Sequence, residues 1–245
     1  MAGHSKWANI RHRKERMDSK RGKVFARLIK ETAVSAKMGG PDPDSNPRLR
    51  LALEKARAAN VPSDNLERAI KRGSGQLEGA DYVEIRYEGY GPGGAALIVD
   101  CLTDNKNRAL SEVRHALNKH GGNLGAGGSV AYMFSRCGIL LYAPGADETA
   151  LMETAIENSA TDLQSGEDGS VEIFCDAADF PNLNDAMRAA GHIPAEADVI
   201  MRPSTETTLS DDDAHKMRRL IGALEDLEDV QQVHTSAVWD EEEPS

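Results

Sequence analysis

The sequence has few cysteines and no long apolar run, and each shortage excludes a class of protein. Its three cysteines, Cys101, Cys137 and Cys175, lie in apolar, strand-like segments without C-x-x-C spacing. They are expected to be buried thiols in a reducing compartment rather than disulfides or metal ligands. No run of about 18 apolar residues occurs, so no membrane-spanning helix is expected. The chain opens without an apolar signal segment, which predicts a cytoplasmic protein without a membrane partner.

Aromatic residues are also scarce, at 4% of the chain, although 40% of the residues are hydrophobic. The cores must therefore be built mainly from Ala, Leu, Val and Ile. A length of 245 residues is long for one domain and fits two or three.

Acidic residues are rare at the start of the chain. The net charge of −11 is a sum over all residues and does not show this uneven distribution of charge. Residues 1–72 contain 18 Lys and Arg against 8 Asp and Glu, whereas residues 73–245 contain 11 against 32. A basic head on an acidic body orients a protein on a polyanion, so the isoelectric point near 5.1 says little about partners.

The cations of the head follow a helical spacing. Six of them recur at intervals of three or four residues, while Phe25, Leu28 and Ile29 fall on the opposite face. An ordinary solvated face mixes both signs of charge, but this row contains no acid, which favours an exposed nucleic-acid-binding face. The row consists of Arg13, Arg16, Lys20, Lys23, Arg27 and Lys30.

The predicted nucleic-acid-binding set is wider than this row. Trp7 can stack on an unpaired base or pack onto the helical domain, and His12 can face phosphate or solvent. The full set is Lys6, Trp7, Arg11, His12, Arg13, Lys14, Arg16, Lys20, Arg21, Lys23, Arg27 and Lys30.

The periodicity of the chain changes near residue 80. Three short helices are expected before it, with Asn46 capping the second, and alternating or buried strands with interspersed helices after it. This order predicts an α+β, multi-domain fold in which an N-terminal helical domain precedes two small α/β sandwich (ferredoxin-like) domains, one inserted in the other. The expected division is residues 1–78, residues 79–135 plus 204–239, the insertion 136–203, and an acidic tail 240–245.

Two glycine-rich segments, "GYGPGG" and "GGNLGAGGS", invite comparison with a phosphate-binding loop. A P-loop needs G-x-x-x-x-G-K-[ST] with a helix opening behind it, whereas "GGNLGAGGS" follows a helix and leads into an expected strand, "SVAYMF". A turn and a helix end are therefore the preferred interpretation, with contact to a partner left open. The residues that such contacts would use are Gly89, Tyr90, Gly91, Asn123 and Gly125.

Signatures of catalysis and metal binding are missing from the sequence. There is no G-x-S-x-G or H-E-x-x-H, and the seven histidines are scattered without ligand spacing. The prediction is a protein that is not an enzyme and has no cofactor or metal, although a site assembled only in three dimensions stays open.

Long stretches of the chain resemble the YebC/PmpR family, which also includes the mitochondrial translational activator of cytochrome c oxidase. They are "MAGHSKWANIRHRK", "KRGKVFARLIKE", "NPRLRLALEKARAANVPSDNLERAIKRG", "YEGYGPGGAALIV", "TDNKNRALSEVRHALNKHGGNLGAGGSVAYMF" and "EDLEDVQQVHTS". The resemblance runs from Met1 to about Trp239, with Arg11 standing where the family usually has Lys. It implies three domains, a regulator commonly described as binding DNA, and roles in translation on the ribosome, including passage through proline-rich stretches. It supplies no catalytic residues.

The sequence therefore predicts a nucleic-acid-binding regulator of gene expression, expected to be a monomer. Phosphate-like spacing of the cations favours positioning contacts over base readout, with a lean toward ribosomal RNA over DNA. Two alternatives stay open: a protein–protein adaptor acting through the acidic domains, and an enzyme using the glycine-rich loops.

Overall fold

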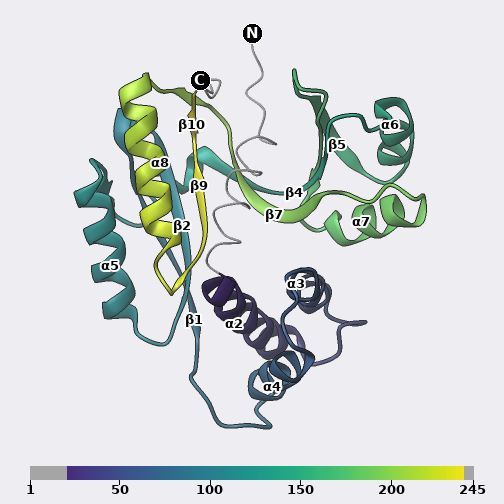
Figure 1. Cartoon of the computed structure of the whole chain (residues 1–245), viewed down its shortest axis with the longest axis horizontal. Helices are drawn as coiled ribbons and strands as arrows, with labels where there is room; N and C mark the ends of the chain where they lie inside the picture. Colours follow the sequence, from purple (N-terminus) through teal and green to yellow (C-terminus); the bar gives the residue numbers. More distant parts are fainter. Residues whose placement is uncertain (1–20, 240–245) are drawn as a thin grey trace.

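The computed structural model describes residues 21–239, without the side chain of Arg21. The elements fall into three groups, a helical domain and two α/β domains (Figure 1). The mixed fold expected from the sequence, with one α/β domain inserted in the other, is confirmed by the order of the strands in the two sheets. The residue boundaries given to the domains stay a prediction, and the tail 240–245 lies outside the described residues.

The helical domain consists of α2 (Arg21–Gly39), α3 (Pro47–Ala58) and α4 (Ser63–Gly73). Asn46 caps α3 as expected, because its side chain accepts a hydrogen bond from the Leu49 amide at 3.1 Å. The Asn46 amide group also donates to the carbonyls of Ser35, at 2.8 Å, and Gly40, at 2.9 Å, which ties α3 to the end of α2. The shared core contains Ala36, Leu49, Leu53, Ala56, Val61 and Leu66.

The first α/β domain is an antiparallel sheet of order β3-β1-β2-β9. Its strands are β1 (Val83–Tyr90), β2 (Ala96–Thr103), β3 (Asn123–Leu124) and β9 (Val230–Thr235). The short helix η1 (Pro92–Gly94) joins β1 to β2, and the helices α5 (Lys106–Lys119) and α8 (Asp211–Glu225) cover one face of the sheet (Figure 1). The core between them includes Leu97, Val99, Val113, Leu117, Met217, Leu220 and Leu224.

The second α/β domain is inserted between β3 and α8. It comprises β4 (Phe134–Tyr142), α6 (Glu148–Glu157), β5 (Ala160–Ser165), β6 (Val171–Asp176), α7 (Phe180–Ala189) and β7 (Glu196–Pro203). The βαββαβ sequence and the sheet order β5-β6-β4-β7 form a ferredoxin-like unit. Its core is built around Leu140, Leu151, Ile173, Leu183 and Met187.

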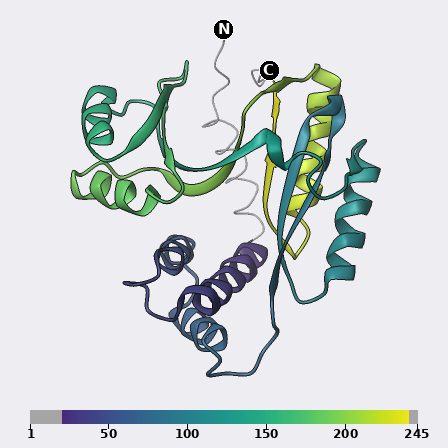
Figure 2. The ribbon, with the colours of Figure 1, turned by 180° about the vertical axis from the view of Figure 1, so that it is seen from behind.

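Strands β4 and β7 connect the two sheets, as the view from behind shows (Figure 2). At the end of the pair nearest the first sheet, Phe134 and Met201 pack with Ala96 and Ile98 of β2 in a separate small core. The insertion is therefore attached by packed strands rather than by two open loops, which restricts how it can move.

Three local expectations are corrected. Residues 129–134 were expected to form a strand, but the segment holds the 3-10 helix η2 (Ala131–Met133) because its amides bond to a side chain instead of to a neighbouring strand. The strand β5 was not expected, since "ATDLQS" is polar and lies at a sheet edge. The segment "VQQVHTSAV" is typical of one continuous last strand, but β9 ends at Thr235, and β10 (Ala237–Val238) pairs in parallel with β8 (Thr207–Thr208).

Asp229 joins the helical domain to the first α/β domain. Its carboxylate, 1% exposed, accepts hydrogen bonds from Lys30 Nζ at 3.0 Å, Thr103 Oγ1 at 2.9 Å and Arg108 Nη2 at 2.7 Å. Burial would raise the pKa of this carboxyl, but the hydrogen bonds from Arg108, Lys30 and Thr103 outweigh burial and lower the pKa. One carboxylate therefore connects α2, β2, α5 and the start of β9.

We expect Asp229→Asn to lower the free energy of unfolding by about 3 kcal/mol at neutral pH, because it leaves the buried Lys30 ammonium poorly compensated. Asp104→Asn is the control, since Asp104 is an exposed partner of the same Arg108 at 2.8 Å and should cost less than about 1 kcal/mol. Urea unfolding followed by circular dichroism measures both variants.

The lowered pKa of Asp229 gives this comparison a pH dependence. The stabilisation is present above the ordinary carboxyl pKa of about 3.9 and is lost as the pH falls through the lower folded-state value. The gap between wild type and Asp229→Asn should therefore narrow below about pH 4, and a gap that is constant with pH would contradict the assignment.

Candidate nucleic-acid interface

Most of the predicted nucleic-acid-binding residues lie outside the residues that the structure describes, and the others form a short row on α2. Lys6, Trp7, Arg11, His12, Arg13, Lys14, Arg16 and Lys20 lie outside the described residues, and Arg21 is described only as the first residue of α2. The remaining three, Lys23, Arg27 and Lys30, are one helical turn apart on α2.

These three cations face the carboxyl end of α8 and the turn that follows it. Lys23 Nζ donates to the Asp226 carbonyl at 2.8 Å, and Arg27 donates to the Glu225 carbonyl and, at 3.5 Å, to that of Leu227. The carboxyl end of a helix carries unsatisfied carbonyls and partial negative charge, so it attracts cations. We call residues 225–229 the acidic corner.

The expectation that the whole cationic face is exposed is wrong at two positions. Arg27 is 6% exposed and Lys30 is 5% exposed, because the acidic corner supplies carbonyl and carboxylate oxygens to both. Lys30 also lies 3.3 Å from the Glu228 carboxylate. Lys23 keeps 49% of its side chain exposed and is the one cation of the described row that solvent reaches freely.

Further cations of the helical domain also pair with the α/β domains. Arg48 bonds to Glu84 of β1 at 2.5 Å, and Lys37 pairs with Asp81. On the other side, Lys55 lies 2.6 Å from Asp198 of β7, and Arg50 lies 3.4 Å from Asp185 of α7. The basic head thus docks onto the acidic body through complementary charge.

Four other cations of the helical domain do not pair with the α/β domains. Arg57, Arg68, Lys71 and Arg72 are exposed, and within residues 21–239 none of them forms an ion pair with a carboxylate. Arg68 bonds only locally, to the Asp64 carbonyl and the Asn65 side chain. These positions extend the positive surface available to an external anion.

The glycine-rich loop after β3 surrounds a buried acid. The Glu88 carboxylate accepts hydrogen bonds from the amides of Gly128 at 2.7 Å, Val130 at 2.8 Å and Ala131 at 2.7 Å. Burial would raise the pKa of Glu88, but these amide hydrogen bonds outweigh burial and lower it. Converging backbone amides form a typical anion-binding nest, and here the protein's own carboxylate fills it.

The predicted loop contacts are brought together around this nest, but two of them are not at the surface. Gly89 and Gly91 are buried and closely packed. A Cβ atom on Gly89 would lie 2.4 Å from the Asn123 carbonyl oxygen, and one on Gly91 would lie 2.4 Å from Met217 Cε. The prediction that Gly89 and Gly91 contact a partner at the surface is therefore corrected. Tyr90 donates to the Ser129 carbonyl at 3.2 Å, Gly125 is half-buried, and Asn123 is exposed.

Sequence reasoning missed two features of this region. Glu88 looked like any acid in an alternating strand, since nothing local marks the amides that it meets. Tyr132, in the segment wrongly expected to be a strand, is 77% exposed beside the glycine-rich loop. An aromatic ring in a Gly-rich turn was the one available signal for the second feature.

The three cysteines of the chain lie in buried or half-buried positions. Burial raises the pKa of Cys101 to about 12 and that of Cys175 to about 11, which keeps both thiols protonated. The expected burial is confirmed for Cys101 and Cys175, and Cys137 is half-buried. Among residues 21–239 there is no group of three metal-ligating side chains, and no helix is long and apolar enough to cross a membrane.

We expect Glu88→Gln to loosen the glycine-rich loop, because the new amide group turns donors toward the backbone donors of the nest. Hydrogen exchange at Gly128, Val130 and Ala131 should accelerate about 10- to 100-fold, as for a lost buried acceptor worth 1–3 kcal/mol. Glu84→Gln, an exposed position on the same strand, should leave these amides unchanged. Equal exchange in Glu88→Gln and wild type would contradict the role of the nest.

Comparison with known proteins gives one consistent result. Residues 5–76 match the family model described as the TACO1/YebC N-terminal domain, and residues 82–237 match that of the TACO1/YebC second and third domain. A "Probable transcriptional regulatory protein" of Laribacter hongkongensis is 60% identical over 240 residues, 98% of this chain and 100% of that protein. One from Neisseria meningitidis serogroup B is 60% identical over 238 residues, covering 97% and 98%.

A solved structure agrees with these matches. The crystal structure of a conserved hypothetical protein from Aquifex aeolicus is 43% identical, has a TM-score of 0.83, and covers 92% of this chain and 93% of its own. The matched models and the relatives together span nearly all of the sequence. The chain therefore belongs to the TACO1/YebC family and is a regulator of the YebC type.

Proposed function

We propose that this regulator binds RNA through its basic head and acts on the ribosome as a translation factor, without catalysing a reaction. The observation that carries the proposal is the surplus of cations in residues 1–72, 18 Lys and Arg against 8 Asp and Glu. The acidic corner and the ion pairs of α3 account for part of this surplus. The cations before α2, together with Arg57 and the basic residues of α4, are assigned to phosphates.

The choice of RNA over DNA rests on the kind of contact that these residues can make. Reading base pairs in the major groove requires an element that presents amide or guanidinium groups to base edges. The exposed face of α4 mixes Arg68 and Lys71 with Asp64 and Glu67, whose carboxylates would meet phosphates or base acceptors unfavourably. Positioning on the phosphates of a structured RNA makes no such demand.

The competing function is a protein adaptor that works through the acidic domains, and the transcriptional name of the relatives keeps DNA as the competing nucleic acid. Some acids of the body already pair with the helical domain, for example Asp198 with Lys55 and Asp229 with Lys30. These acids help to hold the domains together, which weakens the argument that the acidic surface exists for a partner. The buried thiols of Cys101 and Cys175 agree with action in the cytoplasm.

Charge reversal in the head tests the proposal. Neutralising six phosphates gives a slope of log K against log salt of about −5 on a duplex and about −4 on a single strand. Arg11→Glu with Arg13→Glu should weaken RNA binding more than tenfold and flatten this slope. The control with the same charge change, Lys106→Glu with Arg136→Glu, alters exposed residues of the two α/β domains and should bind within about twofold of wild type.

The cellular site is tested by sedimentation of the tagged protein through a lysate gradient, at low and high salt, with and without ribonuclease. Migration with ribosomes that is lost at high salt and after ribonuclease supports the proposal. Migration as a free protein that is retained on duplex DNA would replace it by a role in transcription. Full activity of the charge-reversed head would favour the adaptor.

A further inference from the structure

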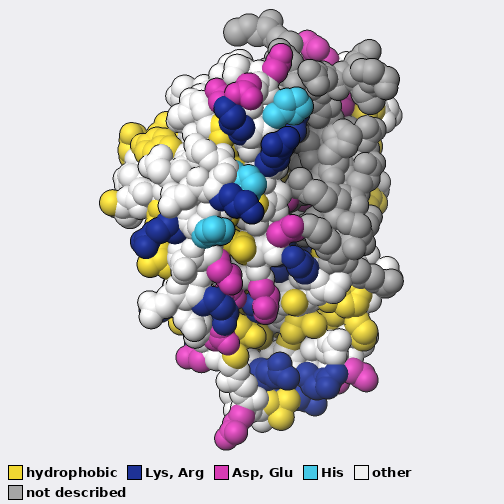
Figure 3. Space-filling view, turned by 60° about the vertical axis from the view of Figure 1, so that its left-hand side comes forward, with side chains coloured by type: hydrophobic (Ala, Val, Ile, Leu, Met, Phe, Trp, Pro, Cys, Tyr) yellow, Lys and Arg dark blue, Asp and Glu magenta, His cyan; other side chains and the backbone are white. Residues whose placement is uncertain are grey.

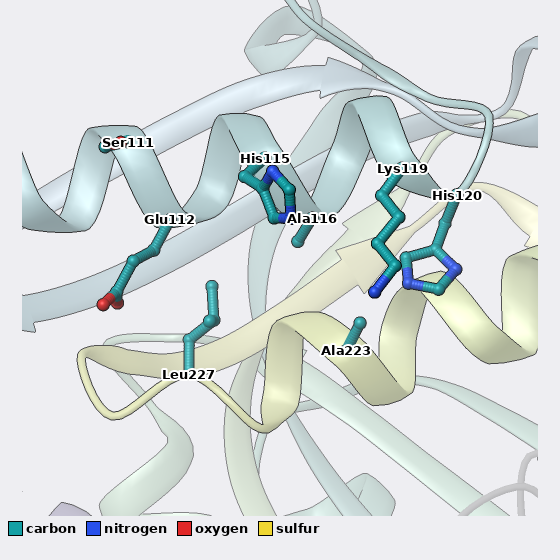
Figure 4. A pocket seen from close by; sticks show the side chains of 8 residues that line it. All are labelled: Ser111, Glu112, His115, Ala116, Lys119, His120, Ala223 and Leu227. Atoms are coloured by element: carbon teal, nitrogen blue, oxygen red, sulfur yellow. The ribbon is translucent and has the colours of Figure 1, made fainter.

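A groove lies on the outer face of the first α/β domain, between the antiparallel helices α5 and α8. Its volume is about 390 Å³, within the range of small-ligand sites and far below that needed to enclose a duplex. It is lined by Ser111, Glu112, His115, Ala116, Lys119, His120, Ala223 and Leu227 (Figure 4). The head, the acidic corner and the glycine-rich loop contribute only Leu227 to this lining.

The basic side chains of the groove lie toward one end, away from Ser111 and Glu112. The Lys119 ammonium points across the groove toward Ala223 of α8, with the imidazole of His120 beside it and that of His115 one turn earlier (Figure 4). Lys119 is exposed, and it forms no ion pair within the part of the chain that the structure describes. Glu112, the one acid of the lining, lies at the opposite end. This end of the groove therefore attracts an anion.

The cationic line continues along α8. Arg219 and His215 precede Ala223 by one and two helical turns, so they share its row, and both are exposed. Lys or Arg side chains and histidines follow one another down this face of the molecule, with Asp and Glu side chains among them (Figure 3). The row is about 12 Å long on α8, since eight residues rise 1.5 Å each.

We propose that this groove binds an unpaired segment of RNA, as a second contact beside the basic head. Lys119 and Arg219 bind successive phosphates, and the imidazoles of His115 and His120 stack on bases over the small apolar floor of Ala116 and Ala223. Unpaired RNA bases stack on aromatic side chains, His included, while cations follow the backbone. The inference rests on the proposed function, because it assigns a second surface to the same ligand.

The chemistry of the lining favours RNA over an acidic peptide. An acidic peptide would use the cations but leave two imidazoles and an apolar floor without a matching group. A nucleotide supplies a phosphate for the cation and a flat, weakly polar ring for the imidazole and the floor. The groove is also too small to enclose duplex DNA, which needs a surface shaped to its grooves.

The test is fluorescence anisotropy with a labelled, unstructured 12-nucleotide RNA and the full-length protein between 50 and 200 mM KCl. The variant is Lys119→Glu. Its matched control is Lys106→Glu, an exposed lysine at the other end of the same helix, with the same change of charge. The double variant Lys119→Glu with Arg219→Glu extends the test to α8, and circular dichroism checks folding.

We expect Lys119→Glu to weaken binding about 5- to 10-fold and to reduce the salt slope by about 0.7, with about twice that reduction for the double variant. Lys106→Glu should stay within about twofold of wild type. A photoreactive base in the RNA should crosslink to peptides containing residues 111–120 or 219–223.

The other outcomes separate the two proposals. Wild type that fails to bind RNA overturns the proposed function and the groove together. Wild-type binding with equal affinity of Lys119→Glu and Lys106→Glu overturns the groove alone and leaves the head in place. If Lys119→Glu weakens binding of an acidic 12-residue peptide but not of RNA, the groove is a protein-docking site. If it weakens binding of single-stranded DNA as much as that of RNA, the assignment to RNA is removed.

Discussion

The arrangement of the domains depends on pairing between cations of the helical domain and acids or carbonyls of the α/β domains, and Asp229 is at its centre. A buried carboxylate is costly unless every neighbour satisfies it, and Asp229 obtains donors from Lys30, Thr103 and Arg108. The cost of burying Lys30 is offset by the same contact. Because these donors come from α2, β2 and α5, the carboxylate is satisfied only when the helical domain sits on the first α/β domain in one orientation. Charge here specifies a geometry more than it adds stability.

This pairing changes the meaning of the charge asymmetry in the sequence. A surplus of cations at one end of a chain suggests a polyanion outside it, yet Lys30, Arg48 and Lys55 find their anions within the same chain. The acidic corner supplies a carbonyl oxygen to Arg27 and a carboxylate oxygen to Lys30, which lies about one helical turn further along α2. Charge composition therefore overstates the free positive surface of a multi-domain protein, and the share left for nucleic acid must be found after the internal pairs are removed.

Much of the fold could be predicted from the sequence, because its signals are local. Asn46 and Ser210 cap their helices through side chains that reach amides three residues on, and alternation marks β1. The errors concern contacts made across the chain. Nothing near Arg27 in the sequence indicates that residues 225–229 will cover it. Likewise, nothing near Val130 and Ala131 indicates that their amides will bond to the Glu88 carboxylate, some forty residues earlier, instead of to a neighbouring strand. The candidate groove could not be predicted from the sequence for the same reason. His115 and Arg219 belong to one surface only because α5 and α8 pack together.

The glycine-rich loop shows how a fold can resemble an anion site and already be occupied. Its amides converge as they would on a phosphate, but the Glu88 carboxylate fills the position and is ionised more readily than usual. An external phosphate would have to displace a carboxylate held by three short hydrogen bonds and anchored by its own strand. The nest therefore orders the loop and holds the exposed Tyr132 beside it. An external anion is expected to prefer surfaces where cations lack an internal partner. By that criterion the exposed cations of α3 and α4 and the groove between α5 and α8 are favoured over the loop, although the loop is the most glycine-rich part of the chain.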